Sequence, residues 1–116
     1  MSVSKIYVAI TFSEKPDKLI VNATQFHDSV TLFWLVTFDG NSPITEFSVQ
    51  HFDPHGINTS HQLTGEEKQL TINNTKVGAR HIFIVRAMNE IGKSDPVTLS
   101  FITVAPGKVC VYVVLH

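Results

Sequence analysis

Hydrophobic and polar residues alternate along much of this chain, and the alternation is strictest between His81 and Gly92. A β-strand places successive side chains on opposite faces, so residues of one parity share a face. The row that begins at His81 continues with three apolar residues that we expect to point into a core. These residues are Phe83, Val85 and Ala87. The sequence therefore predicts a buried central strand in this stretch.

The opposite parity of the same stretch is also apolar. Ile82, Ile84 and Met88 occupy positions where a strand with one solvated face usually carries polar residues, and only Arg86 is charged. We therefore expect an apolar outer surface on this strand.

An apolar outer surface of this kind is typical of a contact site on a small protein. We expect Ile82 and Ile84 to share an outer face with Phe52 of a neighbouring strand, and Phe33 to point outward from a second sheet. We interpret these four residues as a protein-contact surface. Alternatively, these residues have no binding role, because apolar atoms are common on the surfaces of folded proteins.

Short β-rich runs recur about every ten residues, with turn-forming residues between them, which is typical of an all-β sandwich. The turn from Asp39 to Pro43 and the turn from Gly92 to Pro96 are two examples. No long helical periodicity is present. The predicted strands are Lys18–Ala23, Ser29–Leu35, Ile44–Phe52, Asn58–Leu63, Lys68–Ile72, Arg80–Asn89 and Val97–Val104.

Two apolar ends remain outside a domain that spans residues 16–106. The N-terminal extension (residues 1–15) contains Val3–Phe12, and the C-terminal extension (residues 107–116) contains Val109–Leu115. Both have the composition of β-strands. Unpaired apolar strands tend to associate with other strands. We therefore expect at least one of them to pair with a sheet edge, either in its own domain or in a second copy of the chain. Pairing with a second copy would give a homo-oligomer.

Four motifs follow one another across the middle of the chain. A proline at Pro16 precedes an apolar strand, Trp34 ends the run S-V-T-L-F-W, Asp39–Ile44 reads D-G-N-S-P-I, and Val85–Gly92 reads V-x-A-x-N-x-x-G. In this order and spacing the motifs resemble a fibronectin type III domain. The segment Asp39–Phe47 is most similar to domains of neuronal immunoglobulin-superfamily cell-adhesion receptors.

The resemblance implies an all-β fold, an immunoglobulin-like seven-stranded antiparallel β-sandwich, here with extra apolar terminal strands. The family usually has a tyrosine where this chain has His81, with a leucine and a proline at the positions of Thr75 and Val77. That tyrosine normally bonds back to the backbone and pins a corner of the sandwich. Histidine can donate a similar bond but can also ionise. We therefore expect this corner to be less well packed.

Composition narrows the classes of function. Nine Lys and Arg residues face ten Asp and Glu residues with no cluster of either sign, so the sequence predicts no nucleic-acid binding. No apolar run approaches the length of a membrane span, so no membrane insertion is expected. The lone cysteine, Cys110, rules out a disulfide within the chain, and it is either a buried thiol or a bridge to another chain.

The resemblance implies an extracellular domain. The first fifteen residues, however, lack the pattern of a secretory signal, which predicts a cytoplasmic protein if the chain begins at Met1. Three glycosylation sequons favour a secretory origin, at Asn22, Asn58 and Asn73.

Candidate chemistry is sparse. The chain has no nucleophile motif, no phosphate-binding loop and no cofactor motif, so we expect neither an enzyme nor a cofactor. A metal site is the one alternative, because His51, Asp53 and His55 surround a turn and His61 follows on the next strand.

The sequence therefore predicts a non-enzymatic module for protein–protein interaction or cell adhesion, as a free-standing copy of a receptor module. An intracellular structural or self-associating scaffold is the first alternative, and a histidine-based metal-binding protein is the second.

Overall fold

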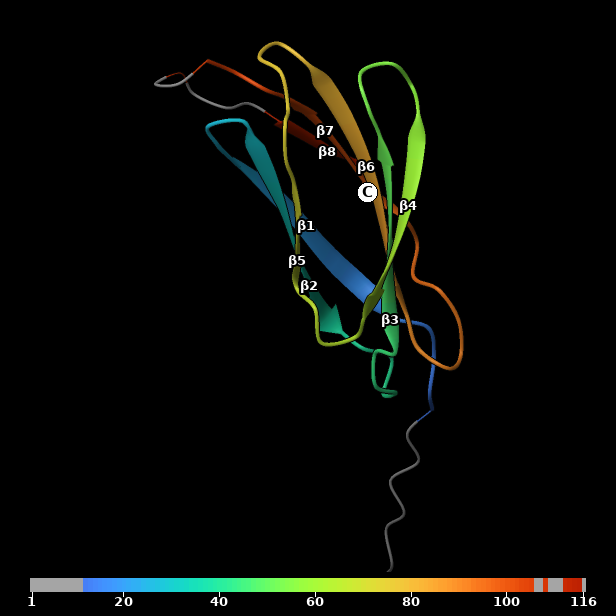
Figure 1. Cartoon of the computed structure of the whole chain (residues 1–116). Coiled ribbons are helices and arrows are strands. Elements are labelled where there is room, and N and C mark those ends of the chain that lie inside the picture. The colour runs from blue at the N-terminus through green and yellow to red at the C-terminus, as the bar shows by residue number, and fades with distance from the viewer. Residues whose placement is uncertain (1–11, 106–107, 109–111, 116) are drawn as a thin grey trace, which may run out of the picture.

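The computed structural model describes residues 12–105, 108 and 112–115, and these residues form two facing β-sheets (Figure 1). One sheet has the strand order β1-β2-β5, and the other has the order β4-β3-β6-β7-β8. The strands are β1 (Asp17–Phe26), β2 (Ser29–Phe38), β3 (Glu46–Phe52), β4 (Asn58–Thr64), β5 (Gln69–Ile72), β6 (Arg80–Met88), β7 (Val97–Ile102) and β8 (Tyr112–Leu115).

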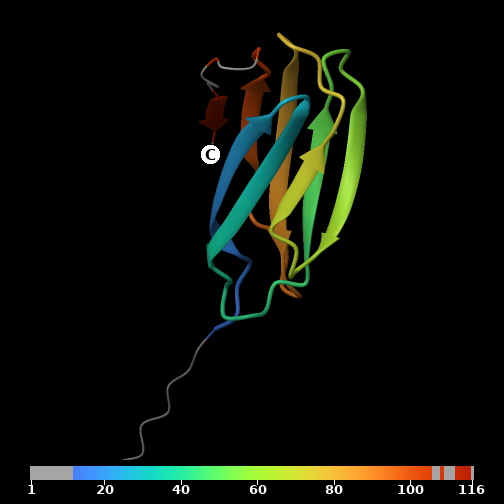
Figure 2. The ribbon, with the colours of Figure 1, turned by 60° about the vertical axis from the view of Figure 1, so that its left-hand side comes forward.

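All the strand pairs are antiparallel, and the two layers pack face to face as a sandwich (Figure 2). The predicted fold class is confirmed. Each of the seven strands expected between residues 16 and 106 is present. β1 and β2 run three residues further than expected, to Phe26 and Phe38, because they pair with each other along their whole length.

Core residues come from alternate positions of both sheets, as the sequence pattern predicts. Phe83, Val85 and Ala87 of β6 are fully buried. They face Trp34 and Leu32 from the opposite sheet within one apolar cluster. Apolar side chains removed from water in this way provide most of the driving force for folding.

Met88 does not lie on the outer surface as its parity suggests. It is only 9% exposed. At this end of β6 the strand gives way to the turn before β7, and Met88 forms an isolated bridge with Lys93. The strand alternation therefore ends one residue earlier than the sequence predicts.

The turn between β2 and β3 requires its glycine. Gly40 has a φ of 78°, a region that residues with a Cβ rarely adopt. A Cβ at this position would lie 1.9 Å from the carbonyl oxygen of Glu14. The chain that enters β1 therefore packs directly against this turn, and the amide of Glu14 donates a 2.8 Å hydrogen bond to the Gly40 carbonyl.

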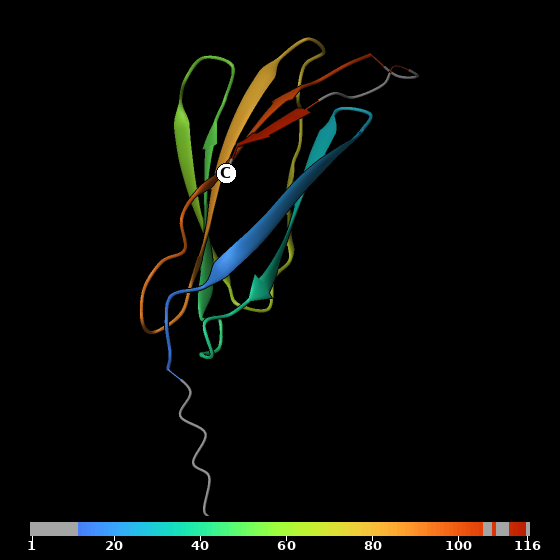
Figure 3. The same cartoon turned by 180° about the vertical axis from the view of Figure 1, so that it is seen from behind.

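The C-terminal extension contains a strand that pairs with its own domain. β8 lies antiparallel along β7 at the edge of the larger sheet (Figure 3), and Tyr112 stacks on Phe101 with ring centroids 6.1 Å apart. Of the expected strand at Val3–Phe12 only Phe12 is described, and it is exposed and lies in no strand. The domain limit at Pro106 and Cys110 lie outside the described residues. The described part of the chain contains no helix that is long and apolar enough to span a membrane.

Candidate functional site

The outer face of the larger sheet carries apolar side chains among polar ones in two rows that cross the strands. In the first row Phe52 lies opposite Ile82, and in the second Gln50 lies opposite Ile84. Each row continues across β7 to β8, where Val113 is 56% exposed and Leu115 is 60% exposed. The complete rows are Asn58–Phe52–Ile82–Ser100–Val113 and Ser60–Gln50–Ile84–Thr98–Leu115.

The structure thus brings together three of the four residues that the sequence assigns to a contact surface. Phe52, Ile82 and Ile84 are half-buried neighbours on this face, which we call the β3–β6 face. Phe33 lies elsewhere, on the outer face of the smaller sheet, where it is 37% exposed. Ile20 and Leu35 pair beside it and are also exposed.

Beneath the β3–β6 face, at one end of the sandwich, two histidines form a buried pair. His51 and His81 are 7% and 4% exposed. The Nε2 atom of His51 lies 2.8 Å from the Nδ1 atom of His81, so one ring donates a hydrogen bond to the other. The ring of His51 also stacks on Phe83, with centroids 4.8 Å apart. Within the described part of the chain, Nε2 of His81 has no hydrogen-bond partner.

Both histidines resist protonation. Burial, followed by the proximity of His81 and then of His61, lowers the pKa of His51 to about 4, although Asp53 acts in the opposite direction. Burial also lowers the pKa of His81, again with Asp53 opposing the change. Both rings are therefore neutral near pH 7. Each carries one proton, and one of these two protons lies in the hydrogen bond between the rings.

The metal candidates do not form a common site. Asp53 lies in the β3–β4 turn, where the amides of His55 and Ile57 donate hydrogen bonds to its Oδ1 atom and lower its pKa. His55 is exposed, and His61 pairs with Val49 rather than with His51. In residues 12–105, 108 and 112–115, no three His, Cys, Asp or Glu side chains are placed to hold one metal ion.

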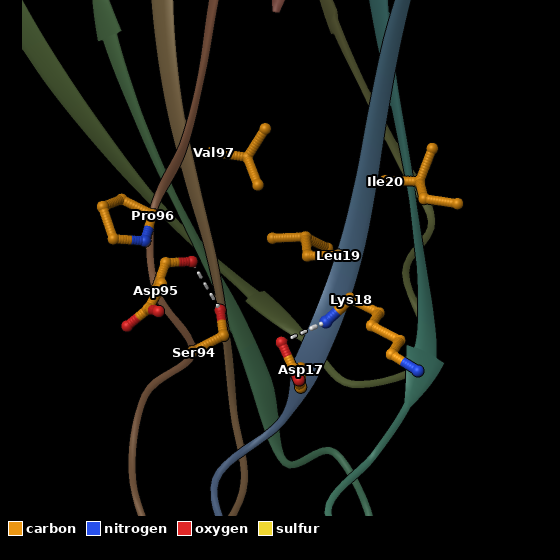
Figure 4. A pocket seen from close by; sticks show the side chains of 8 residues that line it. All are labelled: Asp17, Lys18, Leu19, Ile20, Ser94, Asp95, Pro96 and Val97. Carbon is orange, nitrogen blue, oxygen red and sulfur yellow. Dashed lines mark hydrogen bonds between the residues drawn. The ribbon is translucent and has the colours of Figure 1, made fainter. Parts of the chain in front are cut away.

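Two pockets lie near the ends of the sandwich. One, of about 460 Å³, opens beside the histidine pair between the β3–β4 turn and the β5–β6 connection. The other, of about 350 Å³, lies between the start of β1 and the segment that enters β7 (Figure 4). In this second pocket Ser94 donates to the carbonyl of Asp95, and the Lys18 amide donates to Asp17. Asp17 and Ser94 are therefore bonded to nearby backbone, and the carboxylate of Asp95 is paired with Lys15.

The opposite end of β6 is held by Asn89. Its Nδ2 atom donates to the carbonyls of Glu14 and Asp39 at 2.6 and 2.9 Å. Its Oδ1 atom accepts from the amides of Ile91 and Gly92 at 2.9 and 3.1 Å. The side chain amide thereby uses both its donors and both acceptor positions. It ties together the start of β1, the β2–β3 turn and the β6–β7 turn.

The three sequon asparagines are all exposed. Asn22 lies in the middle of β1 and Asn58 begins β4, whereas Asn73 follows β5. The Oδ1 atom of Asn73 accepts a 2.9 Å hydrogen bond from Ser29.

The histidine pair is the feature that sequence reasoning missed. His51 has the same parity as Phe47 and Val49, both fully buried, so the alternation of β3 could have placed it in the core. Its pairing with His81 depends on how β3 aligns with β6, which one sequence does not reveal.

Comparisons with known proteins agree with this architecture. The sequence profile described as "Fibronectin type III domain" matches residues 14–102. Titin from Drosophila melanogaster is 32% identical over 75 residues, which cover 64% of this chain and, after rounding, 0% of that protein.

Solved structures with a similar fold include the chicken CNTN1 FN1–FN3 domains, with a TM-score of 0.59 and 20% identity over 80% of this chain and 31% of that chain. Domains A168–A170 of titin give a TM-score of 0.56 and 28% identity over 72% of this chain and 30% of that chain. The chain spans less than a third of each of these proteins.

Proposed function

The chain belongs to the fibronectin type III family, and from this premise we propose that it is a non-catalytic module that binds another protein through the β3–β6 face. Domains of this family are generally binding or structural modules without catalytic activity, and they occur in contactin, a neuronal adhesion receptor, and in titin. The mechanism is recognition by a rigid surface without turnover.

The observation that carries this proposal is the apolar surface formed by Phe52, Ile82 and Ile84. Phe52 lies directly opposite Ile82 and diagonally opposite Ile84. On the far side of β7, beyond Ser100 and Thr98, β8 adds the exposed side chains of Val113 and Leu115 to the same outer face. Contiguous outer apolar residues on a small domain usually mark a protein contact. Rigid strands beneath them hold the surface in place before binding, which reduces the entropic cost of association.

The test compares the wild-type chain with the double variant Ile82→Thr and Ile84→Thr in capture of binding partners from cell-surface extracts. Threonine is β-branched and suits a strand, so the fold should persist while the apolar surface is lost. We expect the variant to capture none of the proteins that the wild type captures. Equal capture by the two would refute the proposal.

A matched control makes the same chemical change elsewhere. Val77 and Ile91 lie in connecting segments and are 63% and 53% exposed. The variant Val77→Thr with Ile91→Thr should therefore bind as the wild type does. Phe33, on the outer face of the smaller sheet, is tested separately as Phe33→Ser.

Self-association is a second candidate function, and the position of β8 favours it. Tyr112–Leu115 forms an edge of the larger sheet and carries neither charge nor proline, the usual means of preventing edge-to-edge pairing. Sedimentation velocity of the full chain tests this candidate. A dimer that dissociates in Val113→Lys, at an exposed position of β8, but persists in the Ile82/Ile84 variant would assign self-association to β8.

A further inference from the structure

One sequon asparagine stands directly across from an exposed aromatic ring. Asn22 of β1 pairs with Phe33 of β2, two strands that lie side by side in one layer (Figure 2). Direct cross-strand partners share a face and have Cβ atoms about 5 Å apart. Both side chains point away from the core, since Asn22 is exposed and Phe33 is 37% exposed.

Only the oxygen of the Asn22 side-chain amide is bonded in the described fold. Its Oδ1 atom accepts a 3.1 Å hydrogen bond from the hydroxyl of Tyr112. Among the described residues, no hydrogen-bond acceptor is recorded for its Nδ2 atom. Thr24, which completes the sequon N-A-T, lies on the same strand and is also exposed. The Tyr112 bond therefore fixes the carbonyl side of the amide and leaves the nitrogen side toward solvent.

We propose that Asn22 carries an N-linked glycan whose first sugar packs on the ring of Phe33. In the attachment step, Nδ2 of Asn22 bonds to C1 of an N-acetylglucosamine supplied by a polyprenyl-diphosphate oligosaccharide. The bond between C1 and the diphosphate oxygen breaks, its electron pair leaves with the diphosphate, and Nδ2 loses one proton. The Oδ1 atom keeps its bond to Tyr112.

The surroundings of Phe33 suit a sugar better than they suit an isolated aromatic ring in water. The face of an aromatic ring carries partial negative charge and attracts the weakly positive C–H groups of a pyranose. Across the ring from Asn22, the same row ends at Gln69, whose amide can bond to sugar hydroxyls. The exposed pair Ile20 and Leu35 extends the apolar area beside it.

The other two sequons provide a comparison within the chain. Asn58 repeats the arrangement on the larger sheet, because its direct partner is Phe52. A glycan on Asn58 would cover the Phe52 end of the β3–β6 face. Among the described residues Asn73 pairs with no residue across a strand, and Ser29 donates a hydrogen bond to its Oδ1 atom. A glycan there would lie near Phe26, the cross-strand partner of Ser29, and would have no direct partner like Phe33.

The test expresses the full chain behind a cleavable secretion leader in glycosylating animal cells. Mass spectrometry of peptides measures occupancy of Asn22, and thermal unfolding measures Tm. Thr24→Ala removes the sequon but keeps both Asn22 and its bond to Tyr112. We expect an occupied Asn22, and a Tm that falls by about 4 °C when Thr24→Ala removes the glycan. In a Phe33→Ser background the same change should lower Tm no more than it does in the unglycosylated chain.

Two controls separate the sugar from the protein changes. In bacterially expressed, unglycosylated chain, Thr24→Ala should have the same small effect in both backgrounds, because it then reports only the loss of a strand-favouring threonine. Asn73→Gln should have equal effects with and without Phe33. If Phe33→Ser fails to fold, Phe33→Leu keeps an apolar side chain of similar size without the aromatic face.

An unoccupied Asn22, or a stabilisation that does not depend on Phe33, overturns the proposal. Neither result bears on the proposed protein contact, because Asn22 and Phe33 lie on the smaller sheet and the Ile82/Ile84 test concerns the other.

Discussion

The two ends of β6 are secured by different chemistry. At one end the neutral amide of Asn89 makes four hydrogen bonds to backbone groups of three segments. At the other end His51 and His81 share one hydrogen bond, and each ring can take up a proton. The first end is insensitive to pH between neutrality and mild acid. Burial disfavours a charge on either histidine of the second end, so the two ends should differ in their response to acid.

The largest effect is expected at the Asn89 end. Asn89→Asp keeps the size of the side chain and its acceptor positions, but a carboxylate cannot donate to the carbonyls of Glu14 and Asp39. The two carbonyl oxygens, at part-buried bonds, then face a negative charge in place of a donor, so the free energy of unfolding should fall by about 3 kcal/mol, measured by urea denaturation. The same change at exposed Asn74 is the control, with a loss below about 0.5 kcal/mol. Equal losses at both positions would show that Asn89 does not hold its end.

Acid should weaken the histidine end by a smaller amount. The folded pKa of His51, about 4, lies below the value of about 6.5 for an unfolded histidine, and that of His81 is also lowered. Between these pH values the unfolded chain binds more protons, so stability is complete above pH 6.5 and declines as pH falls toward 4. From pH 7.5 to pH 5 the free energy of unfolding should drop by about 2 kcal/mol. A flat profile in urea denaturation at several pH values would contradict this expectation.

A double-mutant cycle assigns that acid response to the pair. His51→Leu and His81→Phe each leave one buried imidazole without its partner, so each should cost about 1–2 kcal/mol at pH 7.5. The double variant removes both polar groups and should recover most of that loss, because no buried donor or acceptor is left unpaired. It should also lose the decline between pH 7.5 and pH 5. An acid decline that survives in the double variant would place its origin in other groups.

The smallest effect is expected from the one ion pair recorded in the described structure, which lies near Asn89. Lys15 and Asp95 are 2.9 Å apart, but their side chains are 55% and 87% exposed. Lys15 lowers the pKa of Asp95 through a hydrogen bond and through its charge. Exposed pairs contribute little and are screened by salt. Lys15→Met should therefore leave the urea midpoint unchanged within error at 0.15 and at 1 M salt. A clear shift at low salt would mean that charge, as well as the Asn89 amide, secures this end.

The sequence predicted which side chains of β6 are buried in the middle of the strand, but it did not predict the hydrogen bonds at the two ends. Alternation alone placed Phe83, Val85 and Ala87 in the core, because strand geometry fixes which side chains share a face. The partners of Asn89 come from residues 75 and 50 positions away, so their bonds depend on tertiary packing. The histidine at position 81, where the family usually has a tyrosine, was visible in the sequence, yet its buried partner His51 was not.

For the candidate surfaces too, the sequence predicted which residues point outward but not all of their neighbours. The parity of β6 identified Ile82 and Ile84 as outward residues, and their grouping with Phe52 followed from the expected strand order. The pairing of Asn22 with Phe33 required the register of β1 and β2, which two long strands without a bulge can adopt in more than one way. The sequence pattern of a strand therefore predicts which side chains share a face of the sheet. Which residues lie beside them on the neighbouring strand is known only from the folded structure.

The single tryptophan gives the molecule its own optical reporter. Trp34 is 3% exposed, its indole nitrogen donates to the carbonyl of Glu67, and its ring lies 5.5 Å from that of Phe47 across the two sheets. Separation of the sheets brings this indole into water, so its emission moves to longer wavelength. Because the chain has no other tryptophan, fluorescence reports sandwich opening alone. Loosening confined to the histidine end, around β3 and β6, would leave the spectrum unchanged until the two layers part.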